Sequence, residues 1–343
     1  MIRVLVAEDS AVTREYLVYL LGQDPGLEVV ATARNGQEAV QQAERLKPDV
    51  ILMDIHMPGM DGYEATRQVM ERVPTPIVMV SASLSRSEVA MTFEAIKAGA
   101  LTVMEKPVGL DRPDHAETTR RLLETLKLMA EVKVVRRWPR RERPIRPSPP
   151  VVKSDRPVRL IAIGASTGGP AALAEILAGL PGDLVAPILV VQHISPGFTA
   201  GLAEWLGQST RLTVKLAESG ERVRAGAVHL APDRVQLGIA KDGRIHLTKE
   251  LVDGFCPSAS HLFQSVAEAY GSAALGVLLT GMGRDGAGGL KRLREVGGVT
   301  IAQDEESSVV FGMPAEAIRL GAAQYVLSVE QIPGAIRSLV APG

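Results

Sequence analysis

The chain has 343 residues, which is too long for one ordinary domain, so we expect two domains. Hydrophobic residues make up 46% of the chain but aromatic residues only 3%, which indicates aliphatic cores and argues against a surface that stacks nucleic-acid bases. The formal net charge of −1 gives no overall attraction to nucleic acid or to anionic membranes, and the single cysteine, Cys256, excludes an intrachain disulfide.

The N-terminus, MIRVLVAEDS, lacks the charged, apolar and small-residue regions of a signal peptide. No apolar run in the chain reaches membrane-spanning length. We therefore expect a cytoplasmic protein with no membrane insertion and no nucleic-acid partner.

The first part of the chain alternates short β-branched runs with amphipathic patterns. The runs predict strands at 2–7, 27–33, 50–53, 77–81 and 102–104. The amphipathic patterns predict helices at 11–21, 36–46, 63–73, 87–98 and 113–131. Such regular alternation is typical of a doubly wound parallel sheet, in which ligands bind beyond the carboxyl ends of the strands.

Polar side chains follow four of these predicted strands. Glu8 and Asp9 come after the first strand, Asp54 after the third, Ser81 at the end of the fourth and Lys106 after the fifth. Three carboxylates in one crevice repel one another, so the cluster favours a hard divalent cation with oxygen ligands, such as Mg²⁺. Asp54 would then accept a phosphoryl group, whose oxygens the metal and Lys106 would neutralise.

The motifs VLVAEDS, LMDIHMPGMDG, VMVSAS and MEKP make residues 1–122 resemble the response-regulator receiver domain, a flavodoxin-like fold with a five-stranded parallel sheet. The resemblance implies a sensor histidine kinase as phosphodonor and a set of functional residues: the phosphoacceptor Asp54, the Mg²⁺ ligands Glu8, Asp9 and Asp54, and the switch pair Ser81 and Lys106. The chain departs from the family at Val103, where an aromatic residue is common.

Residues 123–157 combine the end of the last predicted helix with an Arg- and Pro-rich stretch. The proline density favours an extended linker rather than a continuing helix. Seven basic residues fall between Lys133 and Arg146, so two other interpretations stay open: a contact with nucleic acid or an acidic surface, and a lining of the crevice between domains that responds to charge at Asp54.

Residues 158–170, VRLIAIGASTGGP, predict a strand, a tight turn and the start of a helix, with Ser166 at the bend. By itself such a turn is more often a phosphate-binding or packing turn than a catalytic one. Its glycines would let a substrate approach the unpaired N–H groups of the helix, so a nucleophilic serine is the alternative.

The rest of the chain extends this pattern into a second, mostly parallel α/β domain. APILVVQ predicts a strand that leads into His193, and the four pieces LTVKLAE, AGAVHLAP, RVQLGIA and RIHLTK predict a hairpin-rich insertion. Further helices are predicted at 258–270 and 290–296, and further strands at 274–279 and 299–302. Ser166, His193 and Asp285 thus each follow a separate predicted strand.

These three strand ends would converge at one edge of a parallel sheet. A serine hydroxyl needs a base to take its proton, which His193 would supply, and a buried carboxylate such as Asp285 would orient that imidazole and stabilise its charge. The N–H groups of Thr167 and Met282 are candidates for binding the oxyanion. The order Ser, His, Asp differs from the α/β-hydrolases, so the G-x-S-x-G pattern at 164–168 is a weak guide here.

The remaining histidines and the cysteine have simpler interpretations. His229 and His246 fall inside short strand patterns, which indicates packing or surface positions. For His261, on the helix after Cys256, a packing or surface position is also favoured, and a place in the pocket wall is the alternative. Cys256 has no second cysteine with which to form a metal site.

The motifs GASTGGP, VQHISPGFT, ESGERVRAGAVHLAPDR, LLTGMGRDGA and TIAQDEESSVVFGMP make residues 158–343 resemble the catalytic domain of chemotaxis-type protein-glutamate methylesterases. The resemblance implies a triad of Ser166, His193 and Asp285, methylated chemoreceptors as substrates, deamidation of receptor glutamines and no cofactor for the esterase reaction. It also implies that phosphorylation activates the enzyme in a two-component pathway. The chain departs from the family at Cys256 and Ser260, where arginine and aspartate are common.

Three alternatives remain beside this interpretation. A binding protein that has lost its chemistry is disfavoured because serine, histidine and aspartate are all present. An esterase of a sensory pathway other than motility stays open. A transcription regulator is disfavoured because the second half has no helix-turn-helix pattern and no basic recognition helix.

Overall fold

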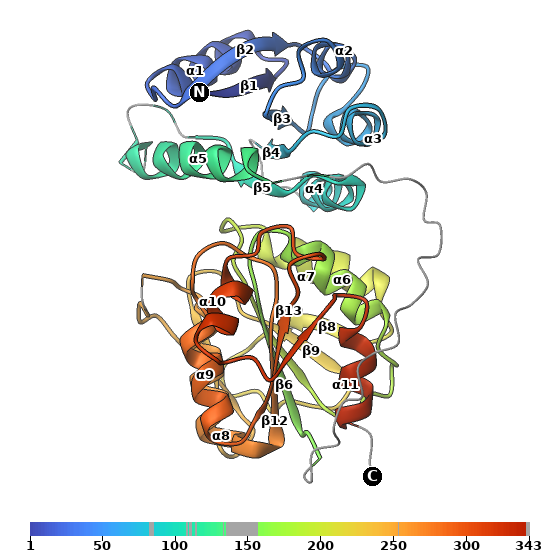
Figure 1. Cartoon of the computed structure of the whole chain (residues 1–343), viewed down its shortest axis with the longest axis vertical. Coiled ribbons are helices and arrows are strands. Elements are labelled where there is room, and N and C mark those ends of the chain that lie inside the picture. Colours follow the sequence, from blue (N-terminus) through green and yellow to red (C-terminus); the bar gives the residue numbers. More distant parts are fainter. Residues whose placement is uncertain are drawn as a thin grey trace. The chain divides into compact units, whose positions relative to one another are not determined.

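The computed structural model describes residues 1–81, 86–107, 109, 112–113, 115–132, 134, 157–252 and 254–340. The chain divides into two compact units, Met1–Arg141 and Glu142–Gly343, which are described separately (Figure 1). The linker expected at 123–157 lies mostly outside the described residues. The domain bounds 1–122 and 158–343 stay predictions.

The first unit contains the predicted five-stranded parallel sheet, with strand order β2-β1-β3-β4-β5. Its strands are β1 (Ile2–Ala7), β2 (Leu27–Ala33), β3 (Val50–Asp54), β4 (Ile77–Ser81) and β5 (Thr102–Glu105). The side chains of β3 and β4 are buried along their whole length, as expected for central parallel strands that are covered on both faces.

Helices cover both faces of this sheet. They are α1 (Ala11–Gly22), α2 (Gly36–Leu46), α3 (Gly62–Arg72), α4 (Arg86–Ala98) and α5 (His115–Ala130). The first three begin at capping residues, because Ser10, Asn35 and Asp61 each accept a hydrogen bond from the backbone N–H three residues later. The sequence therefore encodes where the helices start, and with that the loops that follow β1 and β3.

The second unit is built on a seven-stranded sheet with strand order β14-β13-β12-β6-β7-β9-β8, whose pairings are all parallel. Its strands are β6 (Leu160–Ala165), β7 (Ile188–Gln192), β8 (Thr213–Leu216), β9 (Ala227–Leu230), β12 (Ala274–Leu278), β13 (Val299–Gln303) and β14 (Tyr325–Leu327). The sheet changes winding direction at β6, so the ends of β12, β6 and β7 lie side by side.

The predicted hairpin insertion is smaller than the sequence indicates. Of the four predicted pieces, two form an antiparallel strand pair, β10 (Gln236–Ile239) and β11 (Ile245–Thr248). The other two segments are β8 and β9, which pair in parallel and extend the main sheet beyond β7. Their connection contains no helix, and a helix in the connection is the usual sign of a parallel pair.

The helices of the second unit lie on both faces of the sheet, with α6, α7 and α11 on one face and α8, α9 and α10 on the other (Figure 1). They are α6 (Gly169–Ala178), α7 (Thr199–Ser209), α8 (Ala259–Tyr270), α9 (Ala287–Glu295), α10 (Met313–Arg319) and α11 (Ile332–Val340), and a short 3₁₀ helix, Gly271–Ala273, follows α8. Among the described residues, no helix has the length and apolar character needed to cross a membrane.

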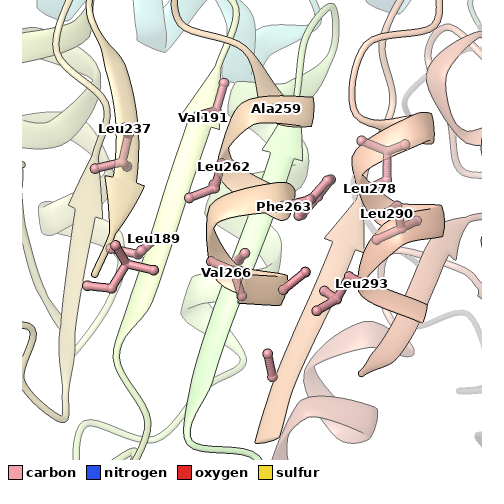
Figure 2. Packing of buried hydrophobic residues seen from close by; sticks show 14 of the residues in the cluster. Leu189, Val191, Leu237, Ala259, Leu262, Phe263, Val266, Leu278, Leu290 and Leu293 are labelled. Carbon is pink, nitrogen blue, oxygen red and sulfur yellow. The ribbon is translucent and has the colours of Figure 1, made fainter. Parts of the chain in front are cut away.

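Helix α8 packs tightly onto the centre of the sheet through Phe263, which is fully buried beside Leu262, Val266 and Leu278 (Figure 2). The Phe263 side chain occupies space that four glycines leave open: an added Cβ would lie 3.0–3.6 Å from it at each of Gly164, Gly276, Gly286 and Gly289. At Gly164 a Cβ would also lie 2.7 Å from the Cβ of Ala259, the first residue of α8. These glycines therefore set how closely the start of α8 approaches the strand that leads to Ser166.

We expect Phe263→Ala to destabilise this unit by about 3–5 kcal/mol, because it removes a fully buried ring and leaves a cavity under α8. The measurement is urea unfolding followed by the fluorescence of Trp205, which is buried in α7. Ile318→Ala, on the partly exposed surface of α10, is the control and should change the unfolding free energy by about 0.5 kcal/mol or less. Equal effects of the two variants would contradict this packing account.

Candidate active site

Ser166 and His193 occupy equivalent positions at the carboxyl ends of neighbouring strands. The pairing of β6 with β7 ends at Ala165 and Gln192, so each of the two residues comes directly after the last paired position. The backbone N–H of His193 donates to the carbonyl of Ala165 at 2.9 Å. The N–H of Ser166 donates to Thr280, beyond the end of β12, at 3.0 Å. The end of β6 is therefore held from both sides.

His193 contacts Asp285, which lies in the connection between β12 and α9. Nε2 of the imidazole is 2.9 Å from Oδ2 of the carboxylate, a hydrogen-bonding distance for an N–H donor. Because a neutral imidazole carries one proton, a proton on Nε2 leaves the lone pair on Nδ1. Nδ1 is then the nitrogen that can accept a proton from a substrate or a serine.

The carboxylate of Asp285 is buried at the N-terminus of α8, with 3% of the residue exposed. Oδ2 accepts from the N–H of Ala259 at 2.7 Å, and Oδ1 accepts from the hydroxyl of Ser258 at 2.8 Å and the N–H of Ser260 at 3.1 Å. Burial alone would raise the pKa of Asp285. The hydrogen bonds from His193, Ser258 and Ser260 outweigh it and hold the pKa far below its ordinary value. Asp285 is therefore an ionised, fixed partner for the imidazole.

Two residues of this site were missed in the sequence. Ser258 is recognisable as a helix cap, but its hydrogen bond to Asp285 joins residues that are 27 apart. Phe255 stacks on the His193 ring, with ring centres 5.0 Å apart and planes 9° from parallel. It lies in a short loop with no hydrophobic period, so no sequence signal indicates its role.

The predicted oxyanion donors are the N–H groups of Thr167 and Met282. Neither N–H donates to a protein acceptor within the described part of the chain. Gly281 brings Met282 close to the serine, because a Cβ at Gly281 would lie only 2.6 Å from the Cβ of Ser166. The hydroxyl of Thr280 donates to the Thr167 carbonyl at 2.9 Å and so joins the two turns. The Thr167 N–H is therefore next to Ser166 in the sequence, and Met282 is brought near Ser166 by the fold.

The two departures from the family pattern lie in different surroundings. Ser260 is buried, and its hydroxyl accepts from the N–H of Gly286 at 2.8 Å, so it holds the loop that carries Asp285 rather than lining a pocket. Cys256 is partly buried, which raises the pKa of its thiol.

The other predicted histidine positions are also accounted for. His229 is buried in β9, as the strand pattern indicates, with Nδ1 3.6 Å from a carboxylate oxygen of Glu221. His246 of β11 and His261 of α8 meet edge to face, with ring centres 6.2 Å apart. Among the described histidines, His193 is the one that contacts Asp285.

A second cluster lies at the carboxyl ends of the strands in the first unit. Nζ of Lys106 is 2.7 Å from Glu8 and 2.9 Å from Asp54. One carboxylate oxygen from each of Glu8, Asp9 and Asp54 lies within 4.8 Å of the others. Burial raises the pKa of both Glu8 and Asp54, and Lys106 only partly offsets it. An all-carboxylate donor set that is short of positive charge fits Mg²⁺.

The residues around this cluster include one that the sequence did not indicate. The Arg14 side chain donates to the carbonyls of Glu8 and Asp9, at 2.8 and 3.2 Å, and so fixes the loop that carries two of the carboxylates. Ser81 is buried at the end of β4, where its carbonyl accepts from the N–H of Lys106 at 2.8 Å. Val103, where the sequence departs from the receiver pattern, is a buried core residue of β5.

Two family models match the chain in consecutive regions. The response regulator receiver domain matches residues 4–126, and the CheB methylesterase matches residues 161–336. Among solved structures, the crystal structure of the Thermotoga maritima CheB methylesterase catalytic domain is 43% identical, with a TM-score of 0.52. It covers 53% of this chain and 99% of that chain.

Curated relatives match over nearly the whole chain. A protein-glutamate methylesterase/protein-glutamine glutaminase of Nitrosospira multiformis is 51% identical over 350 residues, which cover 99% of this chain and 98% of that protein. A relative with the same description from Geobacter metallireducens is 50% identical over 344 residues, with 99% of both chains covered. The chain therefore belongs to the CheB methylesterase family, as a member with an N-terminal response regulator receiver domain.

Proposed function

We propose that this protein hydrolyses the methyl esters of glutamate side chains on chemoreceptors to carboxylate and methanol, and that it deamidates receptor glutamines at the same site. The observation that carries the proposal is the 2.9 Å contact between Nε2 of His193 and Asp285, at the strand end next to Ser166. The descriptions of the relatives from Nitrosospira and Geobacter support this choice of substrate.

In the first half of the reaction, Oγ of Ser166 attacks the ester carbonyl and its proton moves to Nδ1 of His193. Asp285 stabilises the imidazolium, and the N–H groups of Thr167 and Met282 donate to the oxyanion. The bond between the carbonyl carbon and the methoxy oxygen then breaks. The methoxy oxygen takes the proton from Nδ1 and leaves as methanol, which gives an acyl-enzyme.

In the second half, water attacks the acyl-enzyme while Nδ1 of His193 takes its proton. Oγ of Ser166 leaves with that proton, and the product is a free glutamate carboxyl group. This group loses its remaining proton to water, because the ordinary pKa of Glu is about 4.3, and is released as the carboxylate. With glutamine as substrate the atoms balance in the same way, except that ammonia leaves in place of methanol. The same five groups of the protein serve both reactions: the Ser166 hydroxyl, the His193 ring, the Asp285 carboxylate and the N–H groups of Thr167 and Met282.

We propose further that phosphorylation of Asp54 by a sensor histidine kinase increases the esterase activity in a cytoplasmic chemosensory pathway. Glu8, Asp9 and Asp54 would hold Mg²⁺, which neutralises charge on the transferred phosphoryl group. The ammonium group of Lys106 forms an ion pair with Asp54 in the unphosphorylated protein. A phosphoryl group on Asp54 would therefore change the charge that this ammonium group contacts. Ser81, at the end of the adjacent strand, would complete the switch pair.

We expect Ser166→Ala to lose covalent labelling by a fluorophosphonate and to reduce hydrolysis of a glutamate γ-methyl ester peptide at least about a thousandfold, because the attacking oxygen is gone. Ser209→Ala, which removes a hydroxyl at the end of α7, is the matched control and should retain both. Turnover by Ser166→Ala close to that of the control would rule out the nucleophile assignment.

We expect Asp285→Asn to lower kcat by about a thousand- to ten-thousandfold, because an amide no longer fixes the proton on Nε2 of His193. The ionised carboxylate also stabilises the fold at pH values above the ordinary Asp pKa of about 4, and this stabilisation is lost as the pH falls below that value. Urea unfolding should therefore show a gap between wild type and Asp285→Asn at pH 7 that narrows by pH 3. Asp242→Asn, in an exposed turn, is the control. A gap that is independent of pH would contradict a depressed pKa.

We expect acetyl phosphate with Mg²⁺ to stimulate ester hydrolysis by the wild type but not by Asp54→Asn, which cannot form the acyl phosphate. Asp61→Asn removes a nearby carboxylate while keeping a good helix cap for α3, so this variant should respond like the wild type. An undiminished response of Asp54→Asn would show that the coupling does not pass through this residue.

A further inference from the structure

The side chain of Gln192 links the two residues that take part in the proposed proton transfer. Gln192 is the last residue of β7 and is 5% exposed. Its Nε2 donates one hydrogen bond to the carbonyl of Ser166 and another to the carbonyl of His193, both at 2.8 Å. A single amide group therefore joins the main chain of the nucleophile to the main chain of the base.

This link lies just beyond the last ladder bonds of the sheet, which hold the two residues through their N–H groups but leave their carbonyls unpaired within the ladder. The ladder between β6 and β7 ends with the pairing of Ala165 and Gln192, so the carbonyls of Ser166 and His193 point beyond it. Apart from Gln192, the Ser166 carbonyl accepts from the N–H of Gly169 at 2.8 Å, a bond inside its own turn. The Gln192 amide is thus the contact that reaches from one turn to the other.

The turn is shaped to admit the Gln192 side chain. A Cβ at Gly169 would lie 2.0 Å from Oε1 of Gln192 and 2.9 Å from its Cδ, so only glycine leaves room for the amide. Oε1 itself is buried and receives no hydrogen bond from the described residues. A buried carbonyl oxygen without a donor is unfavourable, and an apolar side chain would fill this space without that cost. What a glutamine supplies here, and an apolar residue could not, is the pair of hydrogen bonds donated by Nε2.

We propose that Gln192 is a positioning residue of the esterase site, which fixes the main chain of Ser166 relative to that of His193 and so holds Oγ within reach of Nδ1. The inference rests on the function proposed above for Ser166 and His193. Small displacements between a nucleophile and its base slow a reaction strongly, whereas substrate binding depends on other groups. The effect of losing Gln192 should therefore appear in kcat rather than in KM.

The test compares Gln192→Met with Thr300→Val in the full chain, using a glutamate γ-methyl ester peptide. Methionine keeps the length of the side chain but loses both hydrogen bonds. Thr300 is equally buried, in β13, and its hydroxyl also makes two hydrogen bonds, to the Ala322 carbonyl at 2.7 Å and from the Gln324 N–H at 3.0 Å. We expect Gln192→Met to lower kcat about ten- to a hundredfold with KM within about twofold of wild type. Thr300→Val should keep the wild-type kcat while losing about as much thermal stability as Gln192→Met does.

A second variant reaches the same contact from the other side. Gly169→Ala keeps the glutamine in the sequence but puts a methyl group where its amide lies, so the amide must move. This variant should lower kcat in the same way, although alanine ordinarily favours a helix. The inference is overturned if Gln192→Met and Gly169→Ala both keep the kcat of Thr300→Val, or if their losses fall on KM. Failure of the proposed function gives a different result, namely an active Ser166→Ala enzyme.

Discussion

The geometry of the proposed esterase site depends on one buried carboxylate. The two oxygens of Asp285 accept from the N–H groups of Ala259 and Ser260 and the hydroxyl of Ser258, and Oδ2 also lies 2.9 Å from Nε2 of His193. These donors come from the start of α8 and from the end of β7, while the carboxylate comes from the connection after β12. The positive end of the helix dipole also favours a negative charge at this point. One ionised group thus holds three loops together and sets the direction of the imidazole.

That arrangement requires α8 to start very close to the sheet, and the glycines around Phe263 make this possible. The first glycine of the G-x-S-x-G pattern, Gly164, lies against Ala259 and Leu278, so in this chain it serves the packing of α8. The glycine that makes room beside Ser166 is Gly281, more than a hundred residues later. The same short pattern therefore has a different physical basis here from the one it has in an α/β-hydrolase.

The sequence predicts most strands of both units well, because apolar runs are local signals, although it predicts hairpins where β8 and β9 extend the parallel sheet. It does not predict α7, whose first residues are held by Asp233 through the N–H of Gly197 and the hydroxyl of Thr199 instead of by a local cap. The sequence also does not predict the roles of Ser258 and Gln192. Their hydrogen-bond partners are far away in the sequence or are backbone atoms, which carry no sequence signal. Contacts of this kind exist only once the sheet has formed.

The contact of Nε2 with Asp285 has a mechanical consequence for His193 as the proposed base. Nδ1, the nitrogen that would accept the proton, is bonded directly to Cγ and so lies closer to the main chain of His193 than Nε2 does. Nε2 lies on the far side of the ring, so small rotations about the side-chain bonds move this atom farther and can correct its position. Rotations of the side chain move Nδ1 less. With Nδ1 as the proposed proton acceptor, an error in the position of the strand end would therefore pass almost unchanged to that atom.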